Sequence, residues 1–187
     1  EKTKWGKGAA YFLEFTYSPP AIADIDLDGK PEVLALPNLE RGKVGPIRGS
    51  ALCVWNPDRT YKMEFDPAPR VTESLVSSGR EPNLAVVPGD IQGDAHLEIL
   101  ALHADGTLRA YTSSGKELWA YQAVPDGAWD LAEPLLADVT GDRKAEILHL
   151  VSHRPTKRSI LRVLDGTGKS LFAFGLPFHT LSAPTLA

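Results

Sequence analysis

The chain has 187 residues, of which 43% are hydrophobic and 24% charged, and its net charge is −4 at pH 7. This composition excludes a disordered chain, and the acidic balance excludes the basic face that a nucleic-acid-binding protein needs. The sequence has no apolar run of about 18 residues, so we predict no membrane span.

Cys53 is the one cysteine of the chain, and it lies in an apolar run at residues 51–55. A single cysteine excludes a disulfide within the chain, and its apolar neighbours predict a buried, unreactive thiol. The chain does not begin with Met, from which we expect a mature or excised piece of a longer protein. The first predicted element is an outer β-strand at residues 9–17, where apolar residues dominate.

Three acidic segments share one pattern and organise the rest of the chain. The pattern is Asp-x-polar-x-Asp-x-x-x-Glu followed by an apolar strand. Its copies, named here loop one, loop two and loop three, span residues 24–32, 90–98 and 138–146. They align without a gap, which indicates a structural repeat. The strands that leave the loops are near-continuous apolar runs, as expected for strands buried on both faces, and they span residues 32–36, 98–102 and 146–150.

A β-hairpin follows each loop in the predicted structure. The hairpin strands are predicted at 107–112 and 117–121 in the second repeat, at 160–164 and 170–174 in the third, and at 51–55 and 61–65 in the first. In the strand at 61–65, Lys62 and Glu64 alternate with apolar residues, so both are predicted to face solvent. The connections at 38–50 and 153–158 are predicted to be exposed loops that carry recognition.

Four strands in a unit of about 50 residues are typical of a β-propeller blade. We therefore predict an all-β fold of about three four-stranded antiparallel blades with flanking strands, part of a larger propeller. A closed ring has about four to eight blades, so the end blades should contact further blades of the parent protein or neighbouring copies in an assembly. The alternative is a β-sandwich with coincidental acidic turns. The predicted division is an outer strand of a preceding blade at 1–19, blades at 20–82, 83–133 and 134–181, and the first strand of a following blade at 182–187.

Loop one is predicted to bind Ca²⁺, because a loop that wraps a cation presents alternate residues to it. Oxygen donors in a flexible cage favour calcium, since magnesium prefers a tighter octahedron with several waters. Gly29 supplies a sharp turn. The predicted ligands are the side chains of Asp24, Asp26 and Asp28, the backbone carbonyl of Lys30, and the side chain of Glu32.

The other two loops have three carboxylates each, so we expect them to bind calcium more weakly. Ala95 and Arg143 stand where loop one has Gly29. The alternative for every loop is a metal-free turn in which Asp side chains accept hydrogen bonds from backbone N–H groups. The predicted ligands are Asp90, Gln92, Asp94 and Glu98 in loop two, and Asp138, Thr140, Asp142 and Glu146 in loop three.

From Pro20 to Ala187, these loops and strands resemble the FG-GAP/VCBS repeats of integrin α-subunit propellers and many bacterial surface proteins. The resemblance implies a calcium loop between the first and second strands of each blade. It also implies a secreted or cell-surface protein, extracellular or periplasmic, with an adhesive or ligand-binding role and a protein or glycan partner. The sequence departs from the family pattern at Gln92, Ala95, Thr140 and Arg143, and the Phe-Gly…Gly-Ala-Pro signature is not recognisable.

A second resemblance concerns the outer hairpins. Residues 105–119, which contain a Gly-Lys-x-x-Trp turn, resemble the repeats of quinoprotein propellers, and residues 165–172 form a looser copy. In those propellers the turn docks neighbouring blades, which implies that Trp119 packs between blades and not in a cofactor site. Trp55 and Phe172 are assigned to packing as well.

No catalytic motif accompanies the repeats. The five histidines lack metal-site spacing, and the acidic clusters repeat uniformly where a catalytic site is normally unique. We therefore predict a non-enzymatic, calcium-stabilised extracellular module for ligand binding, adhesion or assembly. The alternative is a fragment of a propeller enzyme, either a polysaccharide lyase-like protein or a quinoprotein-type oxidoreductase.

Overall fold

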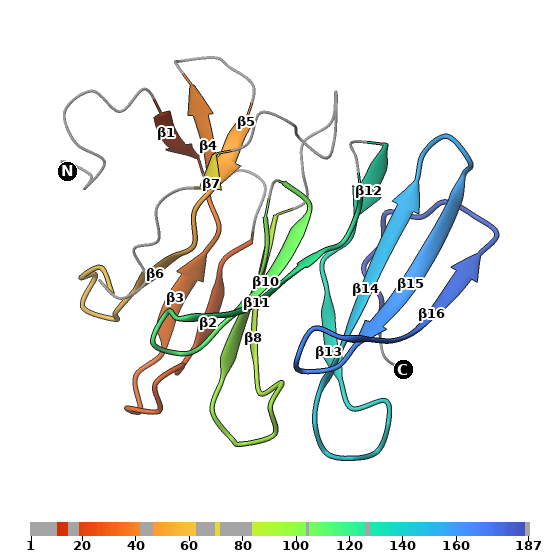
Figure 1. The fold of residues 1–187 in the computed structure, drawn as a ribbon. Helices are drawn as coiled ribbons and strands as arrows, with labels where there is room; N and C mark the ends of the chain where they lie inside the picture. The colour runs from red at the N-terminus through yellow and green to blue at the C-terminus, as the bar shows by residue number, and fades with distance from the viewer. Residues whose placement is uncertain are drawn as a thin grey trace.

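The computed structural model describes residues 11–14, 19–41, 47–62, 70–71, 84–103, 105–125 and 128–185. Within these ranges every helix or strand element is a β-strand, so the chain is all-β, as predicted (Figure 1). None of these residues belongs to a long apolar helix of the kind that spans a membrane.

Each repeat contributes one antiparallel sheet that begins with the strand before its acidic loop, and the first repeat adds a second sheet described below. The first sheet contains β2 (Ala21–Ala23), β3 (Glu32–Ala35) and β6 (Cys53–Trp55), and Tyr61 bridges to Trp55 at its outer edge. The second contains β8 (Ala85–Gly89), β9 (Glu98–Leu102), β10 (Thr107–Tyr111) and β11 (Glu117–Gln122). The third contains β13 (Leu135–Ala137), β14 (Glu146–His153), β15 (Arg158–Leu164) and β16 (Ser170–Leu176). The strands follow one another in chain order within each sheet, which is the arrangement of a propeller blade.

The three sheets stand in a row in chain order (Figure 1). One apolar cluster joins the first and second sheets through residues such as Leu34 and Ile99, and another joins the second and third through residues such as Leu100 and Ile147. These four side chains are completely buried, and each stabilises the fold by roughly 2 kcal/mol relative to an exposed position. The described sheets are therefore β-propeller blades packed face to face in an open row.

The first blade is longer than the sequence predicted. The segment at 38–50, predicted to be a loop, contains β4 (Asn38–Arg41) and β5 (Ile47–Ser50), which pair with each other. The amide of Ala51 donates to the carbonyl of Pro37 in the same register as the β3–β6 ladder, so β3–β4 and β5–β6 form one long interrupted hairpin. Apolar periodicity missed this extension because Pro37 ends the apolar run.

The strand β1 (Tyr11–Glu14) pairs with β4 in a second, four-stranded sheet of the first repeat, ordered β1-β4-β5-β7, although the sequence assigned residues 1–19 to a preceding blade. The strand β7 (Arg70–Val71) pairs with β5 on the other side.

The third blade has a similar extension. β14 continues beyond the predicted end at residue 150, and β12 (Trp129–Leu131) pairs with this continuation, although residues 83–133 were assigned to the second blade. The described residues after β16 form no strand. The segment at 177–182 instead lies against the extension, because Ser159 Oγ donates to the carbonyl of Phe178 and Ser152 Oγ donates to that of Thr180. Residues 186–187 of the predicted final strand lie outside the described residues.

The hairpin turn of the third blade docks on the second blade. Trp119 Nε1 donates a 2.9 Å hydrogen bond to the carbonyl of Gly166. A Cβ at Gly168 would lie 2.8 Å from the Trp119 indole, and one at Gly166 would lie 1.9 Å from the carbonyl oxygen of Ile91. Trp119 therefore lies between two blades. Trp55 instead contacts Tyr61 of its own blade. Phe172, which stands in the third repeat where the second has Trp119, is 40% exposed and contacts Phe174.

Candidate functional site

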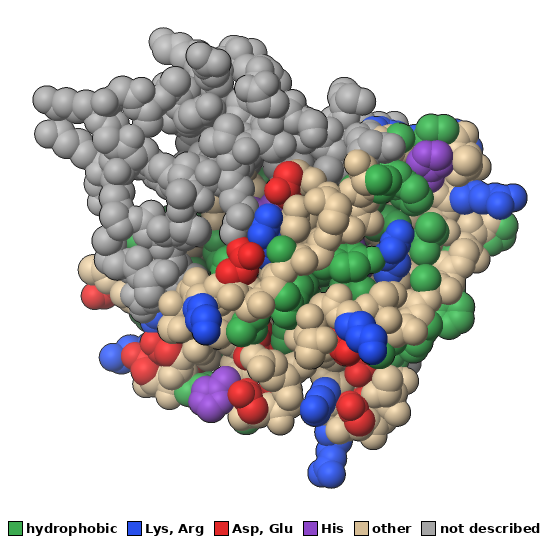
Figure 2. All heavy atoms as spheres, viewed as in Figure 1, with side chains coloured by type: hydrophobic (Ala, Val, Ile, Leu, Met, Phe, Trp, Pro, Cys, Tyr) green, Lys and Arg blue, Asp and Glu red, His purple; other side chains and the backbone are tan. Residues whose placement is uncertain are grey.

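The three acidic loops lie along the same edge of the row of blades, at the bottom of Figure 1. Figure 2 shows acidic and basic side chains side by side along this edge. We number the residues of each loop from one to nine, starting at Asp24, Asp90 and Asp138. This numbering shows that the loops share one backbone conformation.

The shared conformation has left-handed backbone at positions four and six. At position six, Gly29, Ala95 and Arg143 have φ values of 85°, 67° and 71°. At position four, Leu27, Gly93 and Gly141 have φ values of 60°, 75° and 82°. Each loop thus has one glycine and one strained L-residue at these two positions. The departures at Ala95 and Arg143 leave the loop conformation unchanged.

Aspartates at positions one and five fold the loops by accepting backbone hydrogen bonds. Asp24 accepts from the amides of Asp28 and Gly29 at 3.0 and 2.9 Å. Asp138 accepts from the amides of Gly141 and Arg143 at 2.6 and 2.8 Å, and these bonds lower the pKa of its carboxyl. Asp90 makes the corresponding bonds in loop two, whereas the position-five residues Asp28, Asp94 and Asp142 each accept from the amide two residues on.

The glutamates at position nine are the buried anchors of the loops. Glu32, Glu98 and Glu146 are only 1–4% exposed, and their Oε2 atoms accept from the amide at position two of their own loop at 2.8–3.1 Å. Burial raises the pKa of the Glu98 carboxyl. Because each Oε2 atom already accepts a backbone hydrogen bond, the glutamate holds the backbone of its loop in place.

The side chain at position three completes this arrangement in loops two and three. Gln92 Nε2 donates to Glu98 Oε1 at 3.0 Å, and Thr140 Oγ1 donates to Glu146 Oε1 at 3.2 Å. These residues were predicted as metal ligands. In the structure they are hydrogen-bond donors to a buried glutamate.

Loop one differs because an aspartate carboxylate at position three has no proton to donate. Lys62 takes this role from the outer edge of the blade: its Nζ lies 2.5 Å from Asp26 Oδ2 and 3.5 Å from Glu32 Oε1. The prediction that Lys62 faces solvent was wrong, since the residue is 8% exposed. Its ammonium group pairs with the exposed Asp26 and the buried Glu32, which compensates for the loss of hydration.

The ion pair shifts the pKa of both of its partners, Asp26 and Lys62. The hydrogen bond from Lys62 is the main cause that lowers the pKa of Asp26. Burial opposes the charge on Lys62, but the bond to Asp26 and the negative charges of Glu32 and Asp26 outweigh it and raise the pKa of Lys62.

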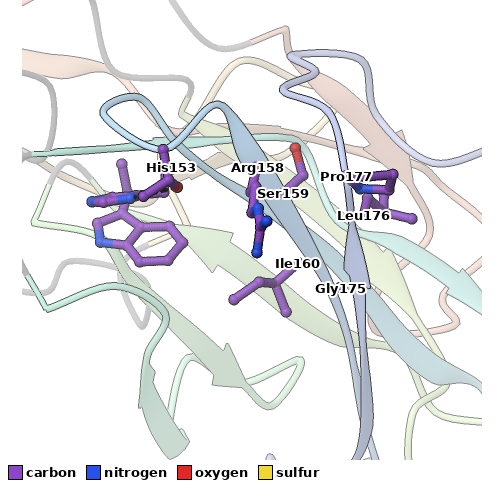
Figure 3. Close-up of a pocket in the computed structure, with 9 residues that line it drawn as sticks. His153, Arg158, Ser159, Ile160, Gly175, Leu176 and Pro177 are labelled. Atoms are coloured by element: carbon purple, nitrogen blue, oxygen red, sulfur yellow. Dashed lines mark hydrogen bonds between the residues drawn. The ribbon is translucent and has the colours of Figure 1, made fainter.

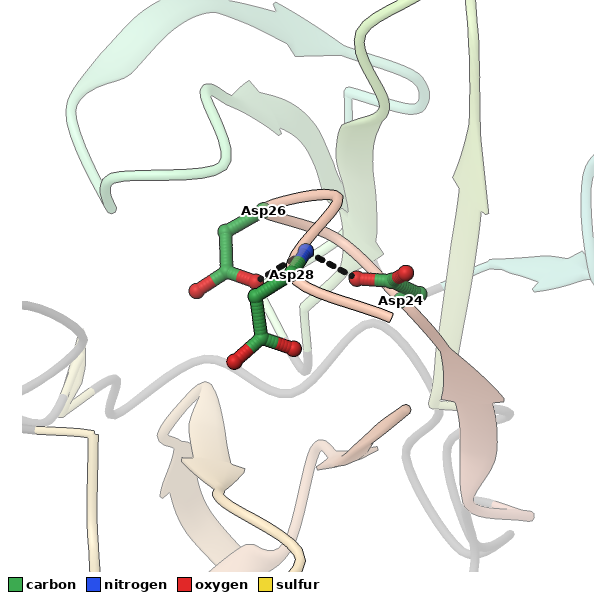
Figure 4. A group of neighbouring side chains, drawn as sticks. All are labelled: Asp24, Asp26 and Asp28. Carbon is green, nitrogen blue, oxygen red and sulfur yellow. Dashed lines mark hydrogen bonds between the residues drawn. The ribbon is translucent and has the colours of Figure 1, made fainter. Parts of the chain in front are cut away.

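Loop one also brings three carboxylates together. One oxygen from each of Asp24, Asp26 and Asp28 lies within 4.8 Å of the other two, the only such cluster of three among the described residues. Both Asp24 and Asp26 accept from the amide of Asp28, which holds the three residues around one point (Figure 4). This hard oxygen donor set fits a calcium ion. The predicted Glu32 ligand turns inward to its backbone bond, so these three aspartates are the residues that would hold the ion.

A second candidate lies at the opposite end of the third blade. A hollow of about 470 Å³ opens beside the extension of β14 and β15, at the upper right of Figure 1 (Figure 3). Sequence analysis expected recognition at 153–158, and the turn at 154–157 borders this hollow. Its lining residues are Trp129, His153, Thr156, Arg158, Ser159, Ile160, Gly175, Leu176 and Pro177.

Comparisons with known proteins give structural neighbours only. No family model matches the chain, and no curated protein matches it. A crystal structure of an ACO/RPE65 chimera matches with 12% identity and a TM-score of 0.47 over 93% of this chain. A quinonprotein alcohol dehydrogenase-like protein from Bacteroides thetaiotaomicron matches with 11% identity and a TM-score of 0.41 over 89%. BBS1N in complex with ARL6DN matches with 9% identity and a TM-score of 0.35 over 91%. The chain spans 38%, 44% and 73% of these three chains.

Proposed function

We propose that this chain is a calcium-stabilised β-propeller module of the FG-GAP/VCBS type. In this proposal it acts outside the cell or in the periplasm, in ligand binding, adhesion or assembly. The observation that carries the proposal is the convergence of the Asp24, Asp26 and Asp28 carboxylates at the edge of the first blade.

Electrostatics explains why a cation would stabilise this loop. Three carboxylates held within 4.8 Å repel one another, and Lys62 contacts only one of them. A divalent ion would neutralise the remaining charge, and its binding free energy would add to the free energy of unfolding. Loops two and three have a neutral side chain at position three, so their need for an ion is smaller.

Calcium titration by isothermal calorimetry tests the proposal. We expect the wild-type chain to bind calcium, and we expect Asp28→Asn to weaken binding by about tenfold or more, because it removes one charged ligand. Asp142→Asn changes the corresponding residue of loop three and is the matched control, with a smaller expected effect. Absence of binding at millimolar calcium, together with equal melting curves in calcium and in chelator, would disprove a calcium-stabilised fold.

A further inference from the structure

We propose that the hollow beside the extension of the third blade is a binding site for a small apolar carboxylate, meaning an apolar or aromatic body that bears one carboxylate group. This inference goes beyond the proposed function, because neither the blade fold nor calcium in loop one requires it.

The site exists because the third blade reaches further than the second. Leu150 aligns with Leu102, where β9 ends, whereas β14 continues to His153 before its hairpin turns. Antiparallel pairing places His153 opposite Arg158 and opposite Trp129, and places Ile160 opposite Gly175. Since paired residues share a face of a sheet, these side chains lie on one face. It is the face that carries Arg162, which bonds Tyr121 of the second blade.

One wall of the hollow is aromatic and is held in place before any ligand arrives. The rings of Trp129 and His153 lie 4.6 Å apart at an interplanar angle of 39°. His153 Nδ1 and Thr156 Oγ1 are 2.9 Å apart in a hydrogen bond, which fixes the imidazole. A fixed aromatic wall offers a flat surface to an apolar ligand at little entropic cost.

The charge of the hollow is positive. Arg158 extends toward Ile160, between His153 and the Leu176–Pro177 side (Figure 3). Among the described residues that line the hollow, none carries a carboxylate. Asp130 is near in sequence but faces away from the hollow, because it is paired with Ser152 on the other face of the sheet. On that face Asp130 forms ion pairs with Arg154 and His179. Arg158, with no acid among the described lining residues, favours an anion, and the fork geometry of its guanidinium group suits a carboxylate.

The lining and the volume define the rest of the ligand. Ile160, Leu176 and Pro177 supply apolar lining, and Gly175 leaves space beside Ile160, since a Cβ at Gly175 would meet no atom within 4 Å. A hollow of about 470 Å³ has the size of a small-molecule site. The lining surface is mainly apolar although four polar side chains border it, so a hydroxyl-rich sugar would replace only part of the hydrogen bonds that it loses to water. An apolar body with one anionic group suits the aromatic wall, the positive charge of Arg158 and the mainly apolar lining.

Two sources supply this chemistry: a free aromatic or aliphatic acid, and the C-terminus of a peptide that ends in an apolar residue. The test uses 3-phenylpropionate for the first and the peptide Ala-Ala-Phe for the second. The neutral amide of each is the matched control, because it preserves shape and removes charge. Glucuronate represents an acidic sugar. Binding is followed by ligand-observed NMR and calorimetry on the full chain.

We expect the wild-type chain to bind at least one carboxylate, and its amide about tenfold more weakly or not at all. Gly175→Leu should abolish binding by filling the hollow while leaving the melting temperature unchanged. Arg158→Gln should reduce the preference for the carboxylate over the amide by about tenfold, whereas Lys169→Gln, at the other end of the blade, should have no effect. Binding of only one of the two carboxylates identifies the source, and binding of both supports the chemistry that the two sources share.

Three results would overturn the assignment. The first is no binding of either carboxylate up to about 10 mM, a concentration that reveals even weak sites. The second is unchanged binding in a folded Gly175→Leu variant, which would place the ligand elsewhere. The third is glucuronate binding as strong as that of 3-phenylpropionate, which would show that the apolar body contributes nothing.

Discussion

The ammonium group of Lys62 lies 2.5 Å from the carboxylate of Asp26, which is one of the three aspartates that converge in loop one. The hairpin turns of the three blades share a left-handed residue, at Arg59, Gly115 and Gly168. Three residues after it stand Lys62, Leu118 and Leu171, so these residues occupy equivalent positions. Loops two and three have neutral residues at position three, so the extra carboxylate and the lysine occur together in the first repeat. Lys62 therefore supplies loop one with a cation from elsewhere in the same blade, and calcium must compete with it for Asp26.

Replacement of this lysine should strengthen calcium binding. We expect Lys62→Leu, which installs the residue of the other two repeats, to raise the calcium affinity of loop one by about tenfold, because Asp26 then has no competing partner. In chelator the same variant should lose roughly 2 kcal/mol of stability, since Glu32 and Asp26 lose their donor. Calorimetry and urea unfolding measure the two effects.

The double variant Asp26→Gln with Lys62→Leu is the control, because it copies position three and the aligned outer-strand residue of the second repeat. It should recover most of the lost stability in chelator without gaining calcium affinity. If Lys62→Leu were as stable as the wild type in chelator, Lys62 would not be the structural cation of the loop.

Glycine substitution at position six should stabilise loops two and three. Ala95 and Arg143 have φ values of 67° and 71°. This left-handed conformation is strained for a residue with a Cβ atom and unstrained for glycine. We expect Ala95→Gly and Arg143→Gly each to raise the free energy of unfolding by about 1 kcal/mol. Gly93→Ala should do the opposite, since φ is 75° there and a Cβ would lie 2.7 Å from the Lys144 side chain. A destabilised Ala95→Gly protein in thermal unfolding would contradict the left-handed assignment.

At Gly166, where the turn of the third blade contacts loop two, the protein should tolerate no side chain. Gly166→Ala would place a Cβ 1.9 Å from the backbone oxygen of Ile91, so the blades must shift apart. We expect a loss of about 2–3 kcal/mol in urea unfolding. Gly175→Ala adds the same methyl group to open space and should change stability little, which separates steric conflict from the intrinsic effect of alanine. Equal stability of the two variants would refute the close approach.

His149 should make the fold sensitive to mild acid. Burial, and then the charge of Arg162, lower the pKa of His149 from 6.5 to about 4. The unfolded chain therefore binds a proton near pH 6.5 that the folded chain takes up only near pH 4. Stability is full above pH 6.5 and falls as the pH drops from 6.5 to about 4. Between pH 7 and pH 5 we expect a loss of about 2 kcal/mol.

Urea unfolding at the two pH values checks this prediction, with His149→Leu as the reference. The variant should lose less stability than the wild type over the same interval, because leucine does not titrate. Parallel losses in both proteins would assign the acid sensitivity to other groups.

Local pattern predicted much of this fold. Strands β9 and β14 begin at the residues expected from the sequence, because an acidic loop followed by an apolar run encodes them within a few residues. The pattern missed β4 and β5, which are stabilised by pairing with β1 and β7, and it missed the continuation of β14 that pairs with β12. Such pairings join distant residues and leave no periodic signal in one segment.

The same distinction explains the candidate site. The aspartates of loop one are adjacent in sequence, so their convergence was predictable, whereas Lys62 approaches from more than thirty residues away. Its alignment with Leu118 and Leu171 was the available signal, because a charged residue stands there in one repeat only. Likewise the sequence shows that loops two and three have their glycine at position four, Gly93 and Gly141, whereas loop one has it at position six, Gly29.

The docking of Gly166 on Ile91 has a consequence for how the chain unfolds. The acidic loop of the second repeat serves as the seat for the turn of the third, and Trp119 bonds the same turn. Neither repeat can open at this contact without exposing the other. Although each repeat is local in sequence, the two should melt as one cooperative unit, with an interfacial free energy that belongs to neither repeat alone.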